Sequence, residues 1–143
     1  MKQEAEFVLD ASITMTWCFV DEASAYADTV LTRLGHASAL TPGIWPLEVC
    51  NALAVAERRG RIDQAGVSRF LTALSALPIL VQPERPERAF NNILALARQY
   101  ALSSYDASYL DLAMRYGLPL ATADTRLKEA AQAAGVAIYL NDD

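Results

Sequence analysis

The sequence is poor in the side chains that build disulfide frameworks, zinc sites and nucleophilic triads. Its 143 residues include two cysteines, Cys18 and Cys50, and one histidine, His36. Two cysteines without a CxxC spacing exclude a disulfide framework, so we expect both to be reduced, small and buried. One histidine excludes a histidine cluster for zinc and argues against a Ser-His-Asp or Cys-His nucleophile. Carboxylates are the side chains left for chemistry.

Positive charge is also scarce. The net charge of −5 argues against a generic basic nucleic-acid binder, because Lys and Arg at phosphates drive such binding. A phosphate substrate would have to meet bound cations or a local arginine patch. Arginines 58, 59 and 61 form the densest cationic stretch. This stretch fits a patch that guides an RNA substrate to the site or, more simply, a solvated helix end.

Long apolar runs, repeats and low-complexity segments are absent. No apolar stretch reaches the length that spans a membrane, and the first residues have no cleavable signal pattern, so we expect a cytoplasmic protein. With 53% hydrophobic residues, the chain is suited to one compact domain over residues 1–143.

Short apolar segments alternate with segments of helical periodicity. This order predicts an α/β fold with a central parallel sheet of about five strands and helices on both faces. The strands are expected within 6–12, 39–42, 77–83, 118–124 and 136–140, and the helices within 21–34, 46–59, 63–77, 86–101, 104–116 and 124–135. In the helix over 46–59, the stripe of Leu47, Cys50, Leu53 and Ala54 is predicted to be buried.

Four acids fall where such a sheet would place a ligand site. Asp10 ends the first predicted strand and Asp124 follows the fourth, while Glu48 and Asp106 lie in the first turns of two helices. Ligand sites of open α/β sheets lie beyond the carboxyl ends of the strands, so these acids are predicted to converge. Oxygen-only ligands favour Mg²⁺ or Mn²⁺ over zinc.

Each acid also fits an ordinary helix-end role. Asp10 and Asp124 fit helix N-caps, Asp106 fits a capping box with Ser103, and Glu48 fits the positive end of its helix dipole. The combination favours a metal centre, because clustered carboxylates repel one another unless a cation or shared protons compensate.

Four blocks in order resemble the PIN-domain family, and more narrowly the VapC-type toxins of toxin-antitoxin pairs. They are FVLDAS with Asp10 and Ser12, PLEVCNAL with Glu48 and Asn51, SSYDASYLDLA with Asp106, and LATADTRL with Thr122 and Asp124. The blocks span almost the whole chain, and every acidic position of the pattern is kept.

The resemblance implies a three-layer fold and endonucleolytic hydrolysis of RNA by metal-activated water, dependent on Mg²⁺ or Mn²⁺. It implies that Asp10 and Asp106 are metal ligands and that Glu48 and Asp124 complete the cluster directly or through water. Ser12, Asn51 and Thr122 would support them. It further implies a homodimer, a small VapB-type antitoxin as partner and inhibition of translation.

Two other functions fit parts of the pattern. Asp10 resembles the phosphorylated aspartate of a receiver or a haloacid-type phosphatase, but Ser12 stands where the haloacid pattern has a second aspartate. A catalytically inactive PIN-like module that binds protein or RNA is the other alternative, and retention of all four acids argues against it.

Overall fold

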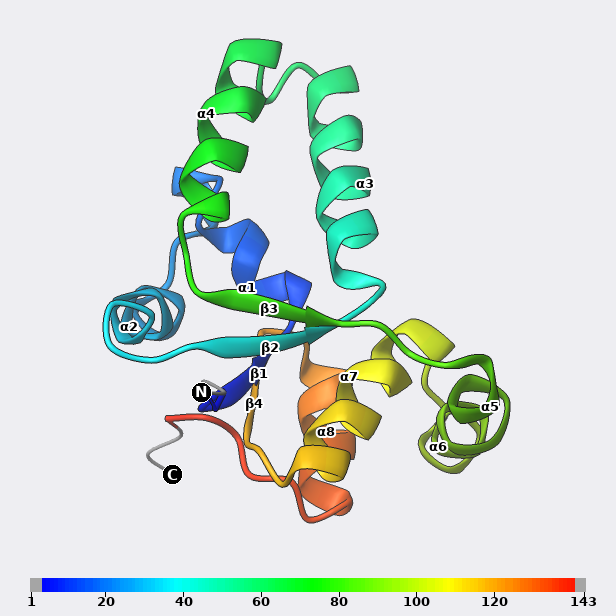
Figure 1. Ribbon diagram of the computed structural model, residues 1–143. Coiled ribbons are helices and arrows are strands. Elements are labelled where there is room, and N and C mark those ends of the chain that lie inside the picture. The colour runs from blue at the N-terminus through cyan, green and yellow to red at the C-terminus, as the bar shows by residue number, and fades with distance from the viewer. Residues whose placement is uncertain (1–3, 141–143) are drawn as a thin grey trace.

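The computed structural model describes residues 4–140, within which a parallel sheet of four strands lies between helices (Figure 1). The strand order is β3-β2-β1-β4, and every pairing is parallel. The strands are β1 (Phe7–Leu9), β2 (Ala39–Pro42), β3 (Ile79–Gln82) and β4 (Leu120–Ala121). The predicted α/β class and parallel sheet are therefore confirmed.

Helices connect the strands and cover the sheet. They are α1 (Ala11–Thr16), the short 3₁₀ turn η1 (Val20–Glu22), α2 (Ala25–Arg33), α3 (Trp45–Arg58), α4 (Gln64–Ser75), α5 (Pro86–Arg88), the π-helical segment η2 (Ala89–Ile93), α6 (Leu94–Tyr100), α7 (Ser104–Tyr116) and α8 (Thr125–Ala133). The single helix predicted over 86–101 is thus interrupted by a π-helical segment. The pair α3 and α4 extends away from the sheet (Figure 1).

The predicted fifth strand over 136–140 is wrong as a full strand. Ile138 forms one isolated parallel bridge with Leu120. The ladder goes no further because the Tyr139 carbonyl accepts a hydrogen bond from the Tyr26 hydroxyl at 2.7 Å, and the next residue, Leu140, has a left-handed φ of 56°. Among the described residues, the sheet therefore has four strands instead of about five.

The alternating side chains of the strands divide the core between the two faces of the sheet. On one face, Val8 belongs to a buried cluster with side chains of α7 and α8; on the other, Phe7 and Leu9 cluster with side chains of α1 and α2. Asp10 is the next residue of the chain. It therefore leaves the sheet between two packed layers, which restricts where its carboxylate can point.

The buried face of α3 differs from the predicted stripe. Of the predicted stripe, Leu53 is buried, whereas Leu47, Cys50 and Ala54 are exposed; the other buried residues of the helix are Trp45, Val49 and Ala56. The prediction was wrong because this helix carries apolar residues on nearly every side, so periodicity alone does not select the face. Both cysteines are free, but Cys50 is exposed and Cys18 only partly buried, so the prediction that both are buried was also wrong.

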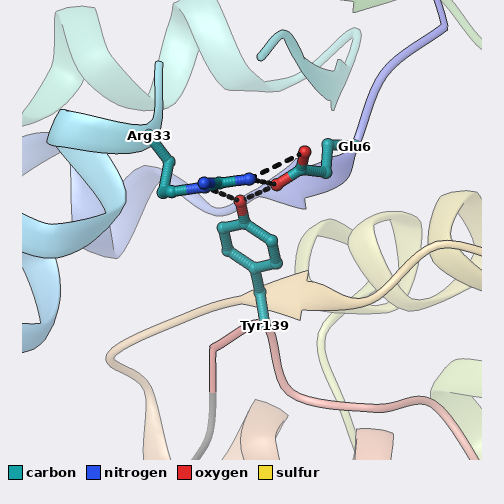
Figure 2. A network of polar contacts seen from close by, with 3 residues as sticks. All are labelled: Glu6, Arg33 and Tyr139. Atoms are coloured by element: carbon teal, nitrogen blue, oxygen red, sulfur yellow. Dashed lines mark hydrogen bonds and ion pairs between the residues drawn. The ribbon is translucent and has the colours of Figure 1, made fainter. Parts of the chain in front are cut away.

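Glu6, Arg33 and Tyr139 form a polar network that joins β1, α2 and the end of the described chain (Figure 2). Arg33 donates to both carboxylate oxygens of Glu6, at 3.1 and 2.9 Å, and to the Tyr139 hydroxyl at 3.2 Å. The Tyr139 hydroxyl also donates to Glu6, and its ring stacks on Phe7 with centroids 4.0 Å apart. The last described residues are thus fixed to the start of β1.

A membrane-spanning helix is not found in the described part of the chain, since no helix there is long and apolar enough.

Candidate metal centre

The four predicted acids lie around the carboxyl-terminal edge of the sheet. In the sheet, β2 and β3 lie on one side of β1, and β4 lies on the other side. The order of the strands therefore reverses at the boundary between β1 and β4. Crevices at such reversal points are where open α/β sheets bind ligands. Asp10 follows β1 and Asp124 lies three residues after β4. The fold therefore brings these two acids close together at this edge.

Asp10 is buried and held by two hydroxyl groups. Only 4% of the residue is exposed. Its Oδ2 accepts hydrogen bonds from Ser12 Oγ at 2.6 Å and from Thr122 Oγ1 at 2.7 Å. The same hydroxyls accept hydrogen bonds from the Ala123 and Asp124 backbone N–H groups, at 2.9 and 3.0 Å. Ser12 and Thr122 therefore fix one oxygen of Asp10 and tie it to the loop that carries Asp124.

Glu48 lies in the first turn of α3 and is fixed by a residue of α7. The hydroxyl of Tyr109, whose side chain is fully buried, donates to Glu48 Oε1 at 2.6 Å. Tyr109 was not singled out from the sequence. The only signal was its position three residues after Asp106, which puts both on neighbouring turns of α7.

Asp124 and Asp106 stand at the beginnings of helices. Asp124 Oδ1 accepts from the Leu127 N–H at 3.0 Å and caps α8. Ser103 caps α7 by accepting from the Asp106 N–H at 3.0 Å, and within residues 4–140 the Asp106 carboxylate itself accepts no hydrogen bond. Asp10 occupies the N-cap position of α1 without a side-chain capping bond. The side chain of Asp124 therefore has the predicted capping role, whereas the side chains of Asp10 and Asp106 do not cap a helix.

The acids share one geometric feature. Asp10, Glu48 and Asp124 each commit one carboxylate oxygen to a protein hydrogen bond, and the other oxygen has no such partner in the described chain. Within the described chain, the buried side-chain atom without a hydrogen-bond partner is Glu84 Oε1. The free oxygens of these acids are not in that class, so they are not sealed from solvent. Four carboxylates therefore each offer an accessible oxygen at this edge.

The acids also disfavour one another's charge. Burial raises the pKa of Asp10, and the Glu48 and Asp124 carboxylates raise it further, against the hydrogen bonds from Ser12 and Thr122. Burial raises the pKa of Asp106 to about 6, with contributions from Asp10 and Asp124, and Arg126 opposes the shift. A site that holds such charges at neutral pH gains from a bound cation.

Glu48 behaves in the same way. Burial raises its pKa, the Tyr109 hydrogen bond lowers it and Asp106 raises it. Asn51, the third supporting residue predicted, is exposed on α3 one turn after Glu48 and makes no side-chain hydrogen bond within residues 4–140. Asn51 and Glu48 line the same hollow.

The donor set fits Mg²⁺ in chemistry, with a limit set by distance. Within residues 4–140, no three Asp, Glu, His or Cys side chains come close enough to surround a metal ion directly. Mg²⁺ commonly keeps several waters and is held by one or two carboxylates together with substrate phosphates. The arrangement therefore suits an ion held by one or two of these acids directly and by the others through water.

Metal-free protein should lose stability as pH rises from about 4 to about 6. The pKa of Asp106 is raised from 3.8 to about 6 in the folded chain, so in this window the folded state binds more protons than the unfolded state. Denaturant unfolding in EDTA should show a fall of about 1 kcal/mol after allowance for solvent screening. The fall should be smaller in Asp106→Asn, and an identical pH profile for that variant would contradict the assignment.

The sequence matches the PIN-domain family over residues 7–133. The chain therefore belongs to the PIN-domain family, as the four sequence blocks predicted. It is also 40% identical over 81 residues to exonuclease VapC9 of Pyrobaculum aerophilum, which covers 56% of this chain and 57% of that protein. The aligned region thus spans little more than half the length of this VapC-type relative.

A solved structure has the same fold. The crystal structure of PAE2754 from Pyrobaculum aerophilum superimposes with a TM-score of 0.70 at 27% sequence identity, covering 88% of this chain and 79% of that one. The three-layer architecture predicted from the resemblance is confirmed.

Proposed function

We propose that this protein is an endoribonuclease that depends on Mg²⁺ or Mn²⁺ and hydrolyses RNA phosphodiester bonds. One observation carries the proposal: buried Asp10 is held by two hydroxyls at an edge where Glu48, Asp106 and Asp124 also present accessible oxygens. Membership of the PIN-domain family and the similarity to a protein called an exonuclease support a nuclease.

The residues would divide the work by their contacts. Asp10 and Asp106 would contact the metal, and Glu48 and Asp124 would hold it directly or through its water ligands. A divalent cation bound here supplies an activated water and offsets charge on the scissile phosphate. Ser12 and Thr122 keep the Asp10 carboxylate in one orientation.

The remaining contacts orient two of the other acids, Glu48 and Asp124. Tyr109 holds Glu48 through Oε1 and leaves Oε2 without a protein partner in the described chain, and the helix cap leaves Oδ2 of Asp124 in the same state. Such supporting hydrogen bonds typically matter 10–100-fold for metal affinity or activity, an order of magnitude taken from other metal sites. Water is the attacking group, so no covalent enzyme intermediate is required.

The direct test is cleavage of RNA by purified protein with Mg²⁺, Mn²⁺ or EDTA. Cleavage should require either metal, stop in EDTA and return with excess Mg²⁺. A circular RNA should be cut as well as a linear one, because a circle has no end for an exonuclease. If only the linear RNA were cut, the protein would be an exonuclease, which is what the name of its relative states for that protein.

Three results would contradict the proposal. Undiminished cleavage in EDTA would exclude the metal, and absence of cleavage with either metal, in protein that binds RNA, would favour the inactive binding module. A covalent phosphate on Asp10 after incubation with a phosphodonor would favour the receiver or phosphatase alternative.

The partners are proposed from the same similarity. We propose that the protein works in the cytoplasm as a homodimer, that it inhibits translation as the toxin of a toxin-antitoxin pair, and that a VapB-type antitoxin restrains it. Similarity to a VapC protein over 81 residues supports the toxin role and the antitoxin partner. The two free cysteines support a reducing compartment such as the cytoplasm. Co-purification with the product of an adjacent small gene would test the pairing.

A further inference from the structure

Two hollows lie along α3, and the first of them contains Glu48 of the acidic edge. The first, of about 390 Å³, is lined by Leu47, Glu48, Asn51 and Tyr105, among others. The second, of about 300 Å³, contains Asn51 again and extends to Arg59 near the helix end. Asn51 and its neighbour Ala52 line both hollows, so the two hollows are adjacent along α3. We call their combined surface, lined by Leu47, Glu48, Asn51, Ala52, Arg59 and Tyr105, the α3 groove.

The α3 groove is long enough for more than one nucleotide. Glu48 and Arg59 are eleven positions apart. At 1.5 Å per helical residue they are separated by roughly 16 Å along the axis. A chain lying in the groove would therefore meet the acidic centre at one end and Arg59 at the other.

Arg59 is the unpaired cation of this groove. Arg61 also lines its far end, but it is ion-paired with Asp21 at 2.9 Å and with Glu22 at 3.0 Å, and its guanidinium lies over the Phe19 ring. The same Arg61 neutralises Glu22, which lines this hollow too. Arg59 is exposed and forms no ion pair within residues 4–140. It can therefore receive an anion without breaking a contact.

The acidic end carries exposed apolar surface. Leu47 is 65% exposed and Tyr105, the residue before Asp106, is 57% exposed. An exposed aromatic ring gives a nucleobase a face to stack on, which is how proteins commonly hold single-stranded RNA.

We propose that the α3 groove holds the single-stranded part of the RNA substrate, with a base against Tyr105 and a backbone phosphate at Arg59. This rests on the proposed ribonuclease function and names the path of its substrate. RNA fits better than a protein partner, because a polyanion would match both the free cation at one end and a metal-loaded acidic centre at the other. Asn51, midway, has an amide that can donate to a phosphate or a base.

The chain provides a matched control for Arg59. Arg58 is its neighbour at the end of α3, is equally exposed, and lines neither hollow. Arg59→Gln and Arg58→Gln therefore make the same charge change at neighbouring positions, of which only position 59 lines the α3 groove.

The first experiment measures binding of a labelled uridine dodecanucleotide by anisotropy in EDTA, so that no cleavage intervenes. Arg59→Gln should weaken binding roughly tenfold, the usual effect of losing one charge-assisted contact. It should also reduce the slope of log affinity against log salt by about 0.7, the value for one phosphate of a single strand. Arg58→Gln should match the unaltered protein in both, and thermal unfolding should show that both variants fold.

The second experiment measures cleavage kinetics with Mg²⁺. Arg59→Gln should raise KM for the dodecanucleotide with little change in kcat, and leave KM for a uridine dinucleotide unchanged, because a dinucleotide at the acidic centre does not reach Arg59. Tyr105→Ala should raise KM for both substrates roughly tenfold, and Tyr105→Phe, which keeps the ring, should not.

The outcomes separate the two proposals. Equal RNA binding by the Arg59 and Arg58 variants, with cleavage intact, would overturn the RNA path alone and leave the α3 groove to a protein partner. Absence of cleavage in every protein would overturn the ribonuclease, while the binding difference in EDTA would still support the path. A loss of affinity shared by both arginine variants would indicate general charge attraction and would also overturn it.

Discussion

Replacing Asp10 by Asn is expected to reduce metal-dependent RNA cleavage by more than about 100-fold without reducing the stability of the fold. The amide keeps the shape of the carboxylate, and its oxygen can accept the hydrogen bonds that Ser12 and Thr122 now donate to Oδ2. The variant loses the negative charge that would bind the cation. Because burial already raises the pKa of Asp10, that charge is unfavourable in the metal-free fold.

The two properties should therefore move in opposite directions. Asp10→Asn should be inactive with Mg²⁺ and Mn²⁺, yet unfold in EDTA at pH 7 at the same or a higher denaturant concentration than the unaltered protein. Asp28→Asn is the matched control, because Asp28 is exposed in the first turn of α2 and makes the same change of charge away from the site. Retained activity, or inactivity accompanied by unfolding, would contradict the role assigned to Asp10.

The largest effect on stability is expected from the ion pair between Arg88 and Asp111. Arg88 donates from Nε and Nη2 to the two carboxylate oxygens at 2.8 and 2.9 Å, and the Asp111 side chain is only 5% exposed. Arg88→Met would leave this buried carboxylate without a cation. Breaking a buried pair on one side typically costs 3–5 kcal/mol, so we expect a loss of about 3 kcal/mol in denaturant unfolding.

A double substitution tests the reason for that loss. Arg88→Met combined with Asp111→Leu removes both charges and should recover most of the stability, since apolar pairs often replace buried ion pairs without loss. Arg98→Met, on the exposed surface of α6, should change stability by less than about 0.5 kcal/mol. If the double variant were as unstable as the single one, packing and not the unpaired charge would be responsible.

The ion pair also bears on the candidate site. Asp111 lies five residues after Asp106 on α7, and on a straight helix this spacing points the two side chains in different directions. In the structure it faces α5. The pair thus anchors the helix that presents Asp106, although Asp111 itself has no place at the acidic edge.

The positions of the four acids could be predicted because each follows from a local rule. Parallel strands end at one edge of a sheet, and the helices that follow them begin there. Asp10 and Asp124 are placed by strand ends, and Glu48 and Asp106 by first helical turns. None of these placements requires knowledge of which distant side chains meet.

The features that the sequence did not predict depend on such meetings. In α3, apolar residues occupy most positions, so only packing against other elements, α1 among them, determines that Val49 is buried and Leu47 exposed. The hydrogen bond from Tyr109 to Glu48 joins residues 61 positions apart. The fifth strand failed because Tyr26, distant in sequence, takes the Tyr139 carbonyl.

The network of Glu6, Arg33 and Tyr139 has a practical consequence for handling the molecule (Figure 2). It brings residues near the two ends of the chain into hydrogen-bonding contact, beside the amino-terminal side of the sheet, whereas the acids lie at the carboxyl-terminal edge. Because Tyr139 and Glu6 are in direct contact, donor and acceptor dyes attached beside these two positions would start close together, so loss of energy transfer would report unfolding directly.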